Sequence, residues 1–242
     1  MNILITGATS GIGKKLALDY KMAGNNVIGI GRNSNELEFL RQNDVIAIEA
    51  DVTSTESLER AIFEVNQIVE QIDLLILNAG SCKYVDIQSF SSATFKDVMS
   101  VNFFGMVNCI EYFLPLLRKS NSPHLVGISS IASYLPLPRA EAYGASKAAV
   151  NYLLEAIAID LISENILVTV VNPGFVDTPL TRLNDFPMPF IINPDKASQL
   201  IIKGIAKRKT EISFPKRLTI SIKIASLIPK TWWRKIAVRF KK

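Results

Sequence analysis

The 242-residue chain has only two cysteines and one histidine, Cys82, Cys109 and His124. Because the cysteines stand in no Cys-x-x-Cys or Cys/His pattern, neither a disulfide framework nor a zinc site is expected, and no metal site is predicted. Two isolated thiols are typical of a reducing compartment. His124 follows a proline at the start of an apolar run and is predicted to be a surface residue that binds no ligand.

Long apolar runs and leader segments are also absent. No run of about 18 apolar residues occurs, so no membrane-spanning helix is predicted. Neither a basic segment nor a cleavage signal precedes the first apolar run, so we expect a cytoplasmic protein without a secretion signal. Disordered and collagen-like classes are excluded, because 48% of the residues are hydrophobic and glycine and proline are not enriched.

Acidic residues are scarce in one part of the chain. Residues 203–242 hold 13 of the 27 Lys and Arg residues and one acid, Glu211. The whole chain has a formal charge of +5, but residues 1–202 carry a net negative charge. A basic excess by itself suggests nucleic acid as a partner. Since the excess is confined to the C-terminal part, outside every motif described below, no nucleic-acid partner is predicted.

Short apolar runs alternate with segments of helical periodicity. Buried strands are expected at residues 2–6, 26–31, 45–50, 72–77, 124–129 and 166–172, and helices at residues 13–23, 58–69 and 145–161. Such alternation is typical of a parallel sheet with helices on both faces. The expected fold class is a Rossmann-like, doubly wound α/β sheet of about seven strands. We expect one domain over residues 1–215, a basic extension over residues 216–242, and a loop at residues 177–194 that covers a site.

A glycine-rich turn, TGATSGIG at residues 6–13, follows the first expected strand. There Gly7 permits a tight turn, Gly11 lets the backbone approach a pyrophosphate, and Gly13 lets helix and strand pack closely. The N-terminus of the next helix offers N–H donors to phosphate. Because the spacing is Gly-x-x-x-Gly-x-Gly, a turn without a ligand is an equally good interpretation of this motif alone. The candidate nucleotide contacts are Gly7, Thr9, Ser10, Gly11, Ile12 and Gly13.

The second expected strand is followed by a base instead of an acid. About 20 residues after the glycine turn, an acid would bind the ribose 2′-hydroxyl of NAD. Gly31, Arg32 and Asn33 stand there instead. A guanidinium suits the 2′-phosphate of NADP through charge-assisted, bidentate contacts. The sequence therefore favours NADP(H) over NAD(H), with Arg32 and Asn33 as contacts, and a solvated arginine at a strand end is the alternative.

Polar residues also follow the third and fourth expected strands. Asp51 and Val52 come after the third strand, and Asn78, Ala79 and Gly80 come after the fourth. Ligands of open parallel sheets lie beyond the carboxyl ends of the strands, so Asp51 is a candidate acceptor for an adenine amine and the 78–80 backbone a candidate contact for a ribose. The alternative is that Asp51 begins a helix, because the residues after it are typical of a helix start.

A serine, a tyrosine and a lysine form the last motif. Tyr143 and Lys147 are four residues apart in a segment of helix formers, so their side chains share one helix face. A nearby ammonium lowers the pKa of a phenol toward the range in which it exchanges protons with a carbonyl or alcohol. Ser130, after the fifth expected strand, would bond the same substrate oxygen. The alternative is an amphipathic helix that carries Tyr and Lys at this spacing without any catalytic role.

Together these motifs resemble the short-chain dehydrogenase/reductase family over roughly residues 1–215. The matching stretches, in the family's order and separation, are residues 6–13, 51–52, 78–80, Asn102 within 101–103, Ser130, 143–147 (YGASK) and 173–178 (PGFVDT). The resemblance implies an oxidoreductase that transfers a hydride between a nicotinamide and a carbonyl or alcohol. It also implies a homodimer or homotetramer, built through helices near residues 95–117 and 143–162.

The resemblance implies a role for each matching residue. Tyr143 would be the general acid/base, Lys147 would lower its pKa and bond the nicotinamide ribose, and Ser130 would polarise the carbonyl. Asn102 would hold a water that links Lys147 to solvent, with a satisfied polar residue inside a helix as the alternative. Ser129 is the alternative to Ser130, but the 13-residue separation between Ser130 and Tyr143 fits the family better. Further cofactor contacts would be Pro173, Gly174, Val176 and Thr178.

The last residues of the chain are amphipathic. On a helix, Trp232, Trp233, Ile236, Ala237 and Phe240 fall on one arc, opposite the bases at positions 234, 235, 239, 241 and 242. Aromatic residues opposite bases are typical of a helix that lies on anionic lipid, which predicts peripheral membrane contact through residues 231–242. The alternative is that the apolar arc packs on the domain or on a second subunit.

The sequence thus predicts an NADP(H)-dependent carbonyl reductase or alcohol dehydrogenase for a small-molecule substrate. Two alternatives stay open, a non-catalytic NADP-binding sensor and a membrane-recruited scaffold. Apolar side chains are expected to flank the substrate entrance and to favour an apolar substrate. They are Tyr134, Leu135, Leu137, Phe175, Leu180, Phe186, Met188 and Phe190.

Overall fold

The computed structural model describes residues 1–240, apart from the side chains of Leu183 and Phe240. Seven parallel strands form one sheet in the order β3-β2-β1-β4-β5-β6-β7. They are β1 (Asn2–Thr6), β2 (Asn26–Gly31), β3 (Ile46–Glu49), β4 (Leu74–Leu77), β5 (His124–Ile128), β6 (Leu167–Pro173) and β7 (Glu211–Phe214). The doubly wound α/β class and the six expected strands are confirmed, and β7 supplies a seventh strand at a place where none was expected.

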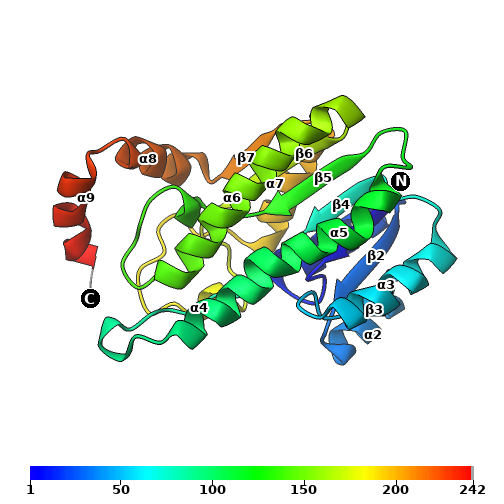
Figure 1. Cartoon of the computed structure of the whole chain (residues 1–242), viewed down its shortest axis with the longest axis horizontal. Helices are drawn as coiled ribbons and strands as arrows, with labels where there is room; N and C mark the ends of the chain where they lie inside the picture. Colours follow the sequence, from blue (N-terminus) through cyan, green and yellow to red (C-terminus); the bar gives the residue numbers. More distant parts are fainter. Residues whose placement is uncertain (241–242) are drawn as a thin grey trace.

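Helices cover both faces of this sheet (Figure 1). They are α1 (Gly11–Met22), α2 (Ser34–Gln42), α3 (Thr55–Ile68), α4 (Ser92–Met99), α5 (Gly105–Leu117), α6 (Glu141–Leu161), α7 (Pro194–Ala206), α8 (Lys216–Ser226) and α9 (Lys230–Ala237). A π-helical turn, η2 (Ser100–Phe104), joins α4 to α5, and the short helices are η1 (Ile87–Ser89), η3 (Ile131–Ser133), η4 (Ile162–Glu164), η5 (Thr181–Leu183) and η6 (Val238–Phe240).

The core consists of two apolar layers, one on each face of the sheet. Leu4 and Leu75 lie in the layer formed with α3, α5 and α6. Their neighbours Ile5 and Ile76 lie in the layer formed with α1, α2 and α7. Because side chains alternate along a strand and both faces are covered, each strand needs a continuous apolar run. This requirement explains why the strands were recognisable in the sequence.

The continuous helix Ser92–Leu117 is long and apolar enough to cross a membrane by length and composition alone. Within it, Met106, Cys109 and Phe113 are buried in the core layer that also holds α3 and α6. The segment is therefore a core helix of the α/β domain. Its outer face leaves Phe104 exposed, as α6 leaves Tyr152 exposed, and assembly through these two helices stays a prediction.

His124 is buried, so its predicted surface position was wrong. It begins β5, a strand with neighbours on both sides, and its Nε2 lies 2.6 Å from Thr169 Oγ1 on β6. Burial lowers the pKa of His124 to about 4, so the imidazole is neutral at pH 7. Among residues 1–240, no group of three or more His, Cys, Asp or Glu side chains is arranged to hold a metal ion.

Candidate active site

The candidate site is a cavity beyond the carboxyl ends of the strands, near the point where the strand order reverses between β1 and β4. Ligands of open α/β sheets bind at such switch points. The glycine turn, the ends of β4 and β5, helix α6 and the loop after β6 all contribute to its wall. The lining residues are Gly7, Ser10, Gly11, Ile12, Asn78, Gly80, Ser81, Ile128, Ser129, Ser130, Tyr143, Lys147, Pro173, Gly174, Val176, Thr178, Pro179, Leu180 and Thr181.

The glycine turn packs directly against the loop after β4. Gly7 and Gly11 have φ values of 65° and 51°, a left-handed region in which other residues are strained. A Cβ on Gly13 would lie 2.3 Å from the Gly7 oxygen and from Asn78 Nδ2. Asn78 Nδ2 also donates to the carbonyls of Thr6 and Gly7, each at 3.1 Å. The Asn78 side chain therefore fixes the turn, a role that sequence reasoning missed because it considered only the backbone there.

The N-terminus of α1 opens toward this cavity. Ser10 is the N-cap residue of α1, and within the described chain its side chain makes no capping hydrogen bond. The N–H groups of the first turn of a helix have no partners within the helix, and they favour an anionic ligand. Because Gly7, Ser10, Gly11 and Ile12 all line the cavity, these residues fit the pyrophosphate of a dinucleotide. Thr9 lies apart from them and contacts Gly31 on β2.

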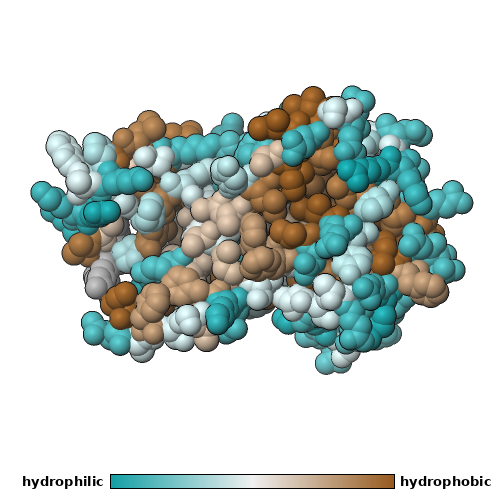
Figure 2. Space-filling view, in the orientation of Figure 1, coloured by the Kyte–Doolittle hydropathy of each residue, from teal (hydrophilic) through white to brown (hydrophobic). Residues whose placement is uncertain are grey.

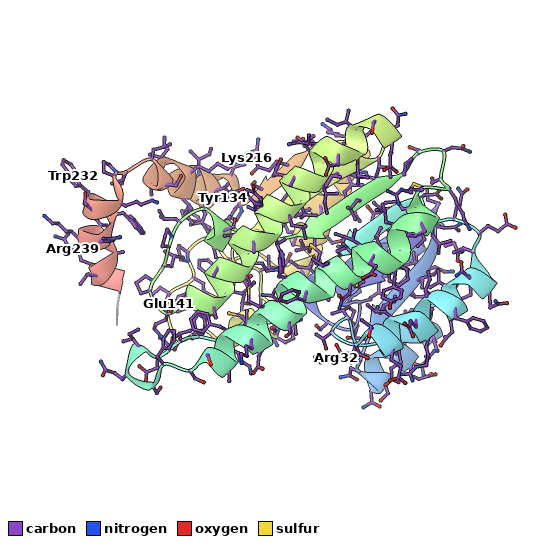
Figure 3. The ribbon with its side chains drawn as sticks, in the orientation of Figure 1. Arg32, Tyr134, Glu141, Lys216, Trp232 and Arg239 are labelled. Carbon is purple, nitrogen blue, oxygen red and sulfur yellow. The ribbon has the colours of Figure 1, made fainter. Side chains whose placement is uncertain are left out.

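Arg32 and Asp51, the two side chains expected near the adenine end of the cofactor, form an ion pair with each other. Arg32 Nη1 lies 3.0 Å from Asp51 Oδ2, and Figure 3 shows Arg32 beyond the end of β2. Partial burial raises the pKa of Asp51, but hydrogen bonds from Thr53 and Arg32 outweigh it and leave that pKa below its usual value. Ser54 caps α3, so Asp51 does not begin that helix, and Asn33 caps α2. Arg32, Asn33, Asp51 and Val52 do not line the cavity itself.

Ser130, Tyr143 and Lys147 lie together in the wall of the cavity. Ser130 hydrogen-bonds the Tyr143 hydroxyl, and Lys147 Nζ lies 5.9 Å from the centroid of the Tyr143 ring. The ammonium donates to the Ile128 carbonyl at 2.9 Å. α6 carries Tyr143 and Lys147 one turn apart, and Ser130 is the N-cap residue of η3, just after β5. The structure therefore brings together the three side chains that the sequence singled out.

The two ionisable groups are shifted by burial. Desolvation raises the pKa of Tyr143 to about 12, although the Ser130 bond opposes the shift, and lowers the pKa of Lys147 to about 8. The predicted lowering of the Tyr143 pKa is wrong for this arrangement, because the Lys147 ammonium bonds Ile128 and not the phenol. At pH 7 Tyr143 is a protonated phenol, able to donate to an oxygen in the cavity.

Comparison with known proteins agrees with this geometry. Residues 1–185 match the family model described as short chain dehydrogenase. The chain belongs to the short-chain dehydrogenase family. It is therefore an oxidoreductase that acts on CH–OH groups and uses a nicotinamide cofactor.

Among its relatives, an uncharacterized oxidoreductase of Myxococcus xanthus is 32% identical over 93% of this chain and 92% of its own. The 11-beta-hydroxysteroid dehydrogenase-like protein 3 of Arabidopsis thaliana is 33% identical over 88% of this chain and 72% of its own. The solved RhlG/NADP active-site complex of Pseudomonas aeruginosa is 27% identical with a TM-score of 0.79, covering 89% of this chain and 94% of that one.

In this short-chain dehydrogenase, Ser129 and Ser130 point to different partners. Ser129 Oγ donates to the backbone oxygen of Lys147 at 3.1 Å, and Ser130 bonds Tyr143. Ser129 thus ties β5 to α6, and Ser130 is the serine that interacts with Tyr143; its contact with a substrate oxygen stays a prediction.

Asn102 lies in the π-helical turn and is fully buried. Its Oδ1 accepts from the Ser81 amide at 2.7 Å, and its Nδ2 donates to the Ser81 carbonyl at 2.9 Å and to Ser146 Oγ at 2.8 Å. The side chain is therefore satisfied within the protein, as the alternative interpretation of this residue expected. It joins the loop after β4 to α6, and its water-holding role stays a prediction.

The loop after β6 folds over one side of the cavity, as expected for residues 177–194. Thr178 and Thr181 line the cavity, and Thr181 is bonded to both Thr178 and Val176. Of the apolar residues expected at the entrance, only Leu180 lines the described cavity. Tyr134 does not line the cavity, and its hydroxyl donates to Glu211; its predicted place beside the substrate entrance stays a prediction.

Two side chains near Tyr143 were missed by sequence reasoning. Cys82 and Tyr84 follow the Asn78-Ala79-Gly80 motif, and both interact electrostatically with groups of the site. Tyr84 hydrogen-bonds Asn184 and packs edge-on against Phe186, with ring centroids 5.7 Å apart. These contacts join the loop after β4 to the loop after β6. No spacing of residues in the sequence predicts these contacts, because they form only between loops that are distant in the sequence.

Proposed function

We propose that this short-chain dehydrogenase reduces an apolar carbonyl compound with NADPH. The observation that carries the proposal is the meeting of a protonated Tyr143 with Ser130 and Lys147 in the wall of the cavity. A carbonyl oxygen there would accept hydrogen bonds from Ser130 and Tyr143, and Tyr143 would transfer its proton to that oxygen. When bound, the reduced nicotinamide supplies the hydride for the carbonyl carbon.

Lys147 and the glycine turn would hold the cofactor. The buried ammonium lies beside the phenol and within reach of the cavity, where it would bond a ribose and favour the phenolate that proton transfer leaves. The positive φ values of Gly7 and Gly11 and the uncapped N-terminus of α1 fit a pyrophosphate. Asn102 would act as a positioning residue that fixes Ser81 and α6.

The proposed preference for NADPH rests on Arg32. Its Nη1 bonds Asp51, and a guanidinium has five N–H donors, so others stay available for a 2′-phosphate. The related Pseudomonas aeruginosa protein, 27% identical, was solved with NADP. Arg32→Ala should weaken NADPH binding about tenfold and leave NADH binding nearly unchanged, which titration of cofactor fluorescence measures. Arg60→Ala is the matched control, because its side chain is 67% exposed against 68% for Arg32; an equal loss for both cofactors would overturn the preference.

The proposed substrate is apolar because Ile128, Val176 and Leu180 line the cavity. Two relatives are named 11-beta-hydroxysteroid dehydrogenases, and two Arabidopsis thaliana relatives, 33% and 30% identical, are named 11-beta-hydroxysteroid dehydrogenase-like proteins. A fused-ring or long aliphatic carbonyl compound fits this character. Figure 3 shows Tyr134 on the segment before α6 and Glu141 at the start of α6, and neither residue lines the cavity.

Turnover of NADPH with a panel of ketones and aldehydes tests the activity. Tyr143→Phe should lower kcat by about a thousandfold, because the proton donor is lost. Tyr152→Phe on the same helix is the control and should leave turnover unchanged, since Tyr152 lies on the exposed face of α6. Turnover that survives Tyr143→Phe would overturn the mechanism. Tight NADPH binding with no turnover of any compound would favour a sensor.

A further inference from the structure

Helix α8 carries an apolar stripe that faces solvent. Ile220, Ile224 and Leu227 are spaced i, i+4 and i+7, so they share one helix face, and each is more than half exposed. The opposite side of α8 packs on the domain through Leu218 and Thr219, which are buried. Contiguous exposed apolar residues mark surfaces that bind a partner.

Helix α9 carries exposed apolar side chains of its own while it is held on the domain. Trp233 Nε1 donates to the Pro136 carbonyl at 2.8 Å, and Ala237, one turn later, is buried. Trp232 and Ile236, on the adjoining face, are exposed. The predicted apolar arc is therefore split, because one half packs on the protein and the other faces solvent. Figure 3 shows Trp232 and Arg239 projecting away from the sheet, and the Phe240 side chain and Lys241–Lys242 lie outside the described residues.

The charge around these apolar residues has one sign. Residues 212–242 contain nine Lys and Arg residues and no acid. Within the described chain, Lys223 is paired with Glu211 at 2.6 Å, while Arg217, Lys230, Arg234 and Lys235 form no ion pair. Figure 2 shows apolar and hydrophilic atoms mixed over the α8–α9 arm at one end of the molecule. A partner for this face must accept apolar side chains and several positive charges at once.

We propose that α8 and α9 form a docking surface for an anionic lipid bilayer. Exposed Ile, Leu and Trp side chains would enter the boundary between headgroups and acyl chains, and the bases would contact anionic headgroups. A symmetric pairing of two such faces is disfavoured, because it would bring the bases of both copies together. The acid-free sequence from residue 212 onward supplies the charge complementarity that selects the bilayer.

The docking surface is connected to the rim of the cavity. Trp233 holds Pro136, and three residues later Arg139 forms two hydrogen bonds with Asp185 in the loop after β6, at 2.8 and 2.9 Å. A docked molecule would thus present the loops around the site near the membrane. This consequence rests on the proposed function and implies a substrate dissolved in lipid, whereas the docking itself does not depend on catalysis.

Tryptophan fluorescence of the full chain tests the docking directly. The chain has two tryptophans, Trp232 and Trp233, and both lie in α9. Vesicles of phosphatidylglycerol with phosphatidylcholine should shift the emission to the blue and sediment the protein, and added salt should weaken the binding. Vesicles of phosphatidylcholine alone should do neither. No shift and no sedimentation with anionic vesicles, or equal binding to both kinds of vesicle, would overturn the proposal.

Variants separate lipid binding from misfolding and from self-association. Arg234→Gln with Lys235→Gln should weaken vesicle binding about 30-fold, and Ile224→Ser should weaken it about tenfold. Phe63→Ser on α3 is the matched control for Ile224→Ser, because Phe63 is 67% exposed and Ile224 is 62% exposed. NADPH binding should be unchanged in all three. The proposal would be overturned if the unmodified chain bound no lipid and formed a dimer that Ile224→Ser dissociates. This face would then bind a second copy of the chain.

Discussion

The two cations proposed to hold the cofactor, Lys147 and Arg32, lie in opposite environments. Lys147 is 4% exposed and donates to a backbone carbonyl beside Tyr143. Arg32 is largely exposed, and the Asp51 carboxylate with which it pairs is also partly exposed. Burial shifts the pKa of an ionisable group, and removing the partner of a buried group lowers stability strongly. An exposed ion pair contributes only about 0–1 kcal/mol to stability. We infer that chemistry depends on the buried end of the crevice and that cofactor choice is adjusted at the exposed end.

The largest expected effect in this comparison comes from Lys147→Met. Loss of the ammonium should lower kcat for carbonyl reduction by about a hundredfold or more, because the phenolate left by proton transfer loses its nearest cation. Single-turnover oxidation of NADPH measures the effect. The unmodified enzyme should lose activity above about pH 8, the pKa to which burial lowers Lys147. Tyr143 stays protonated there because its pKa is about 12.

The pH profile separates this role from a structural one. If Lys147 only packs against Ile128, the Lys147→Met variant should keep the fall in activity above about pH 8. If the ammonium acts on the reaction, that fall should disappear from the residual activity. If Lys147→Met left both kcat and the pH profile of activity unchanged, the proposed contrast between the Lys147 end and the Arg32 end of the crevice would be wrong.

Asn102→Ala should give the next largest effect, on stability. The substitution removes three hydrogen bonds and leaves the Ser81 N–H and carbonyl without this partner, while the Ser146 hydroxyl keeps its bond to the Tyr143 carbonyl. Buried polar groups without partners cost about 1–3 kcal/mol each, so we expect the free energy of unfolding to fall by about 2–4 kcal/mol. Urea unfolding measures it. Asn66→Ala, on the outer side of α3, is a suitable control, and a loss below about 0.5 kcal/mol for Asn102→Ala would contradict the importance of this buried network.

The sequence predicted what depends on local pattern and missed what depends on contacts between loops. Strands β1 and β2 begin and end where their apolar runs do. β7 was missed because it has four residues and lies in a basic stretch. His124 was wrongly placed at the surface, because a strand that starts with Pro-His looks exposed until its neighbours β4 and β6 are known.

The same limit applies within the site. The spacing of Tyr143 and Lys147 on one helix is a local property, and the sequence therefore brought this pair together with Ser130. The bonds of Tyr84 with Asn184 and of Trp233 with Pro136 span 100 and 97 residues. No periodicity encodes such contacts. The direction of the Tyr143 pKa shift was also beyond the sequence, because burial of the phenol decides it.

Asp51→Asn should give the smallest effect and tests the exposed end. The amide keeps an oxygen that can accept from Thr53, as Asp51 does at 2.9 Å, so the turn should persist. Loss of an exposed ion pair should lower the free energy of unfolding by less than about 1 kcal/mol. Removing a negative charge beside Arg32 should also strengthen NADPH binding about two- to fivefold and leave NADH binding unchanged, since only NADPH has a 2′-phosphate. High salt should erase that gain, because exposed charges are screened. A loss of stability comparable with that of Asn102→Ala would show that the exposed end is structural, and the contrast between the two ends of the crevice would then fail.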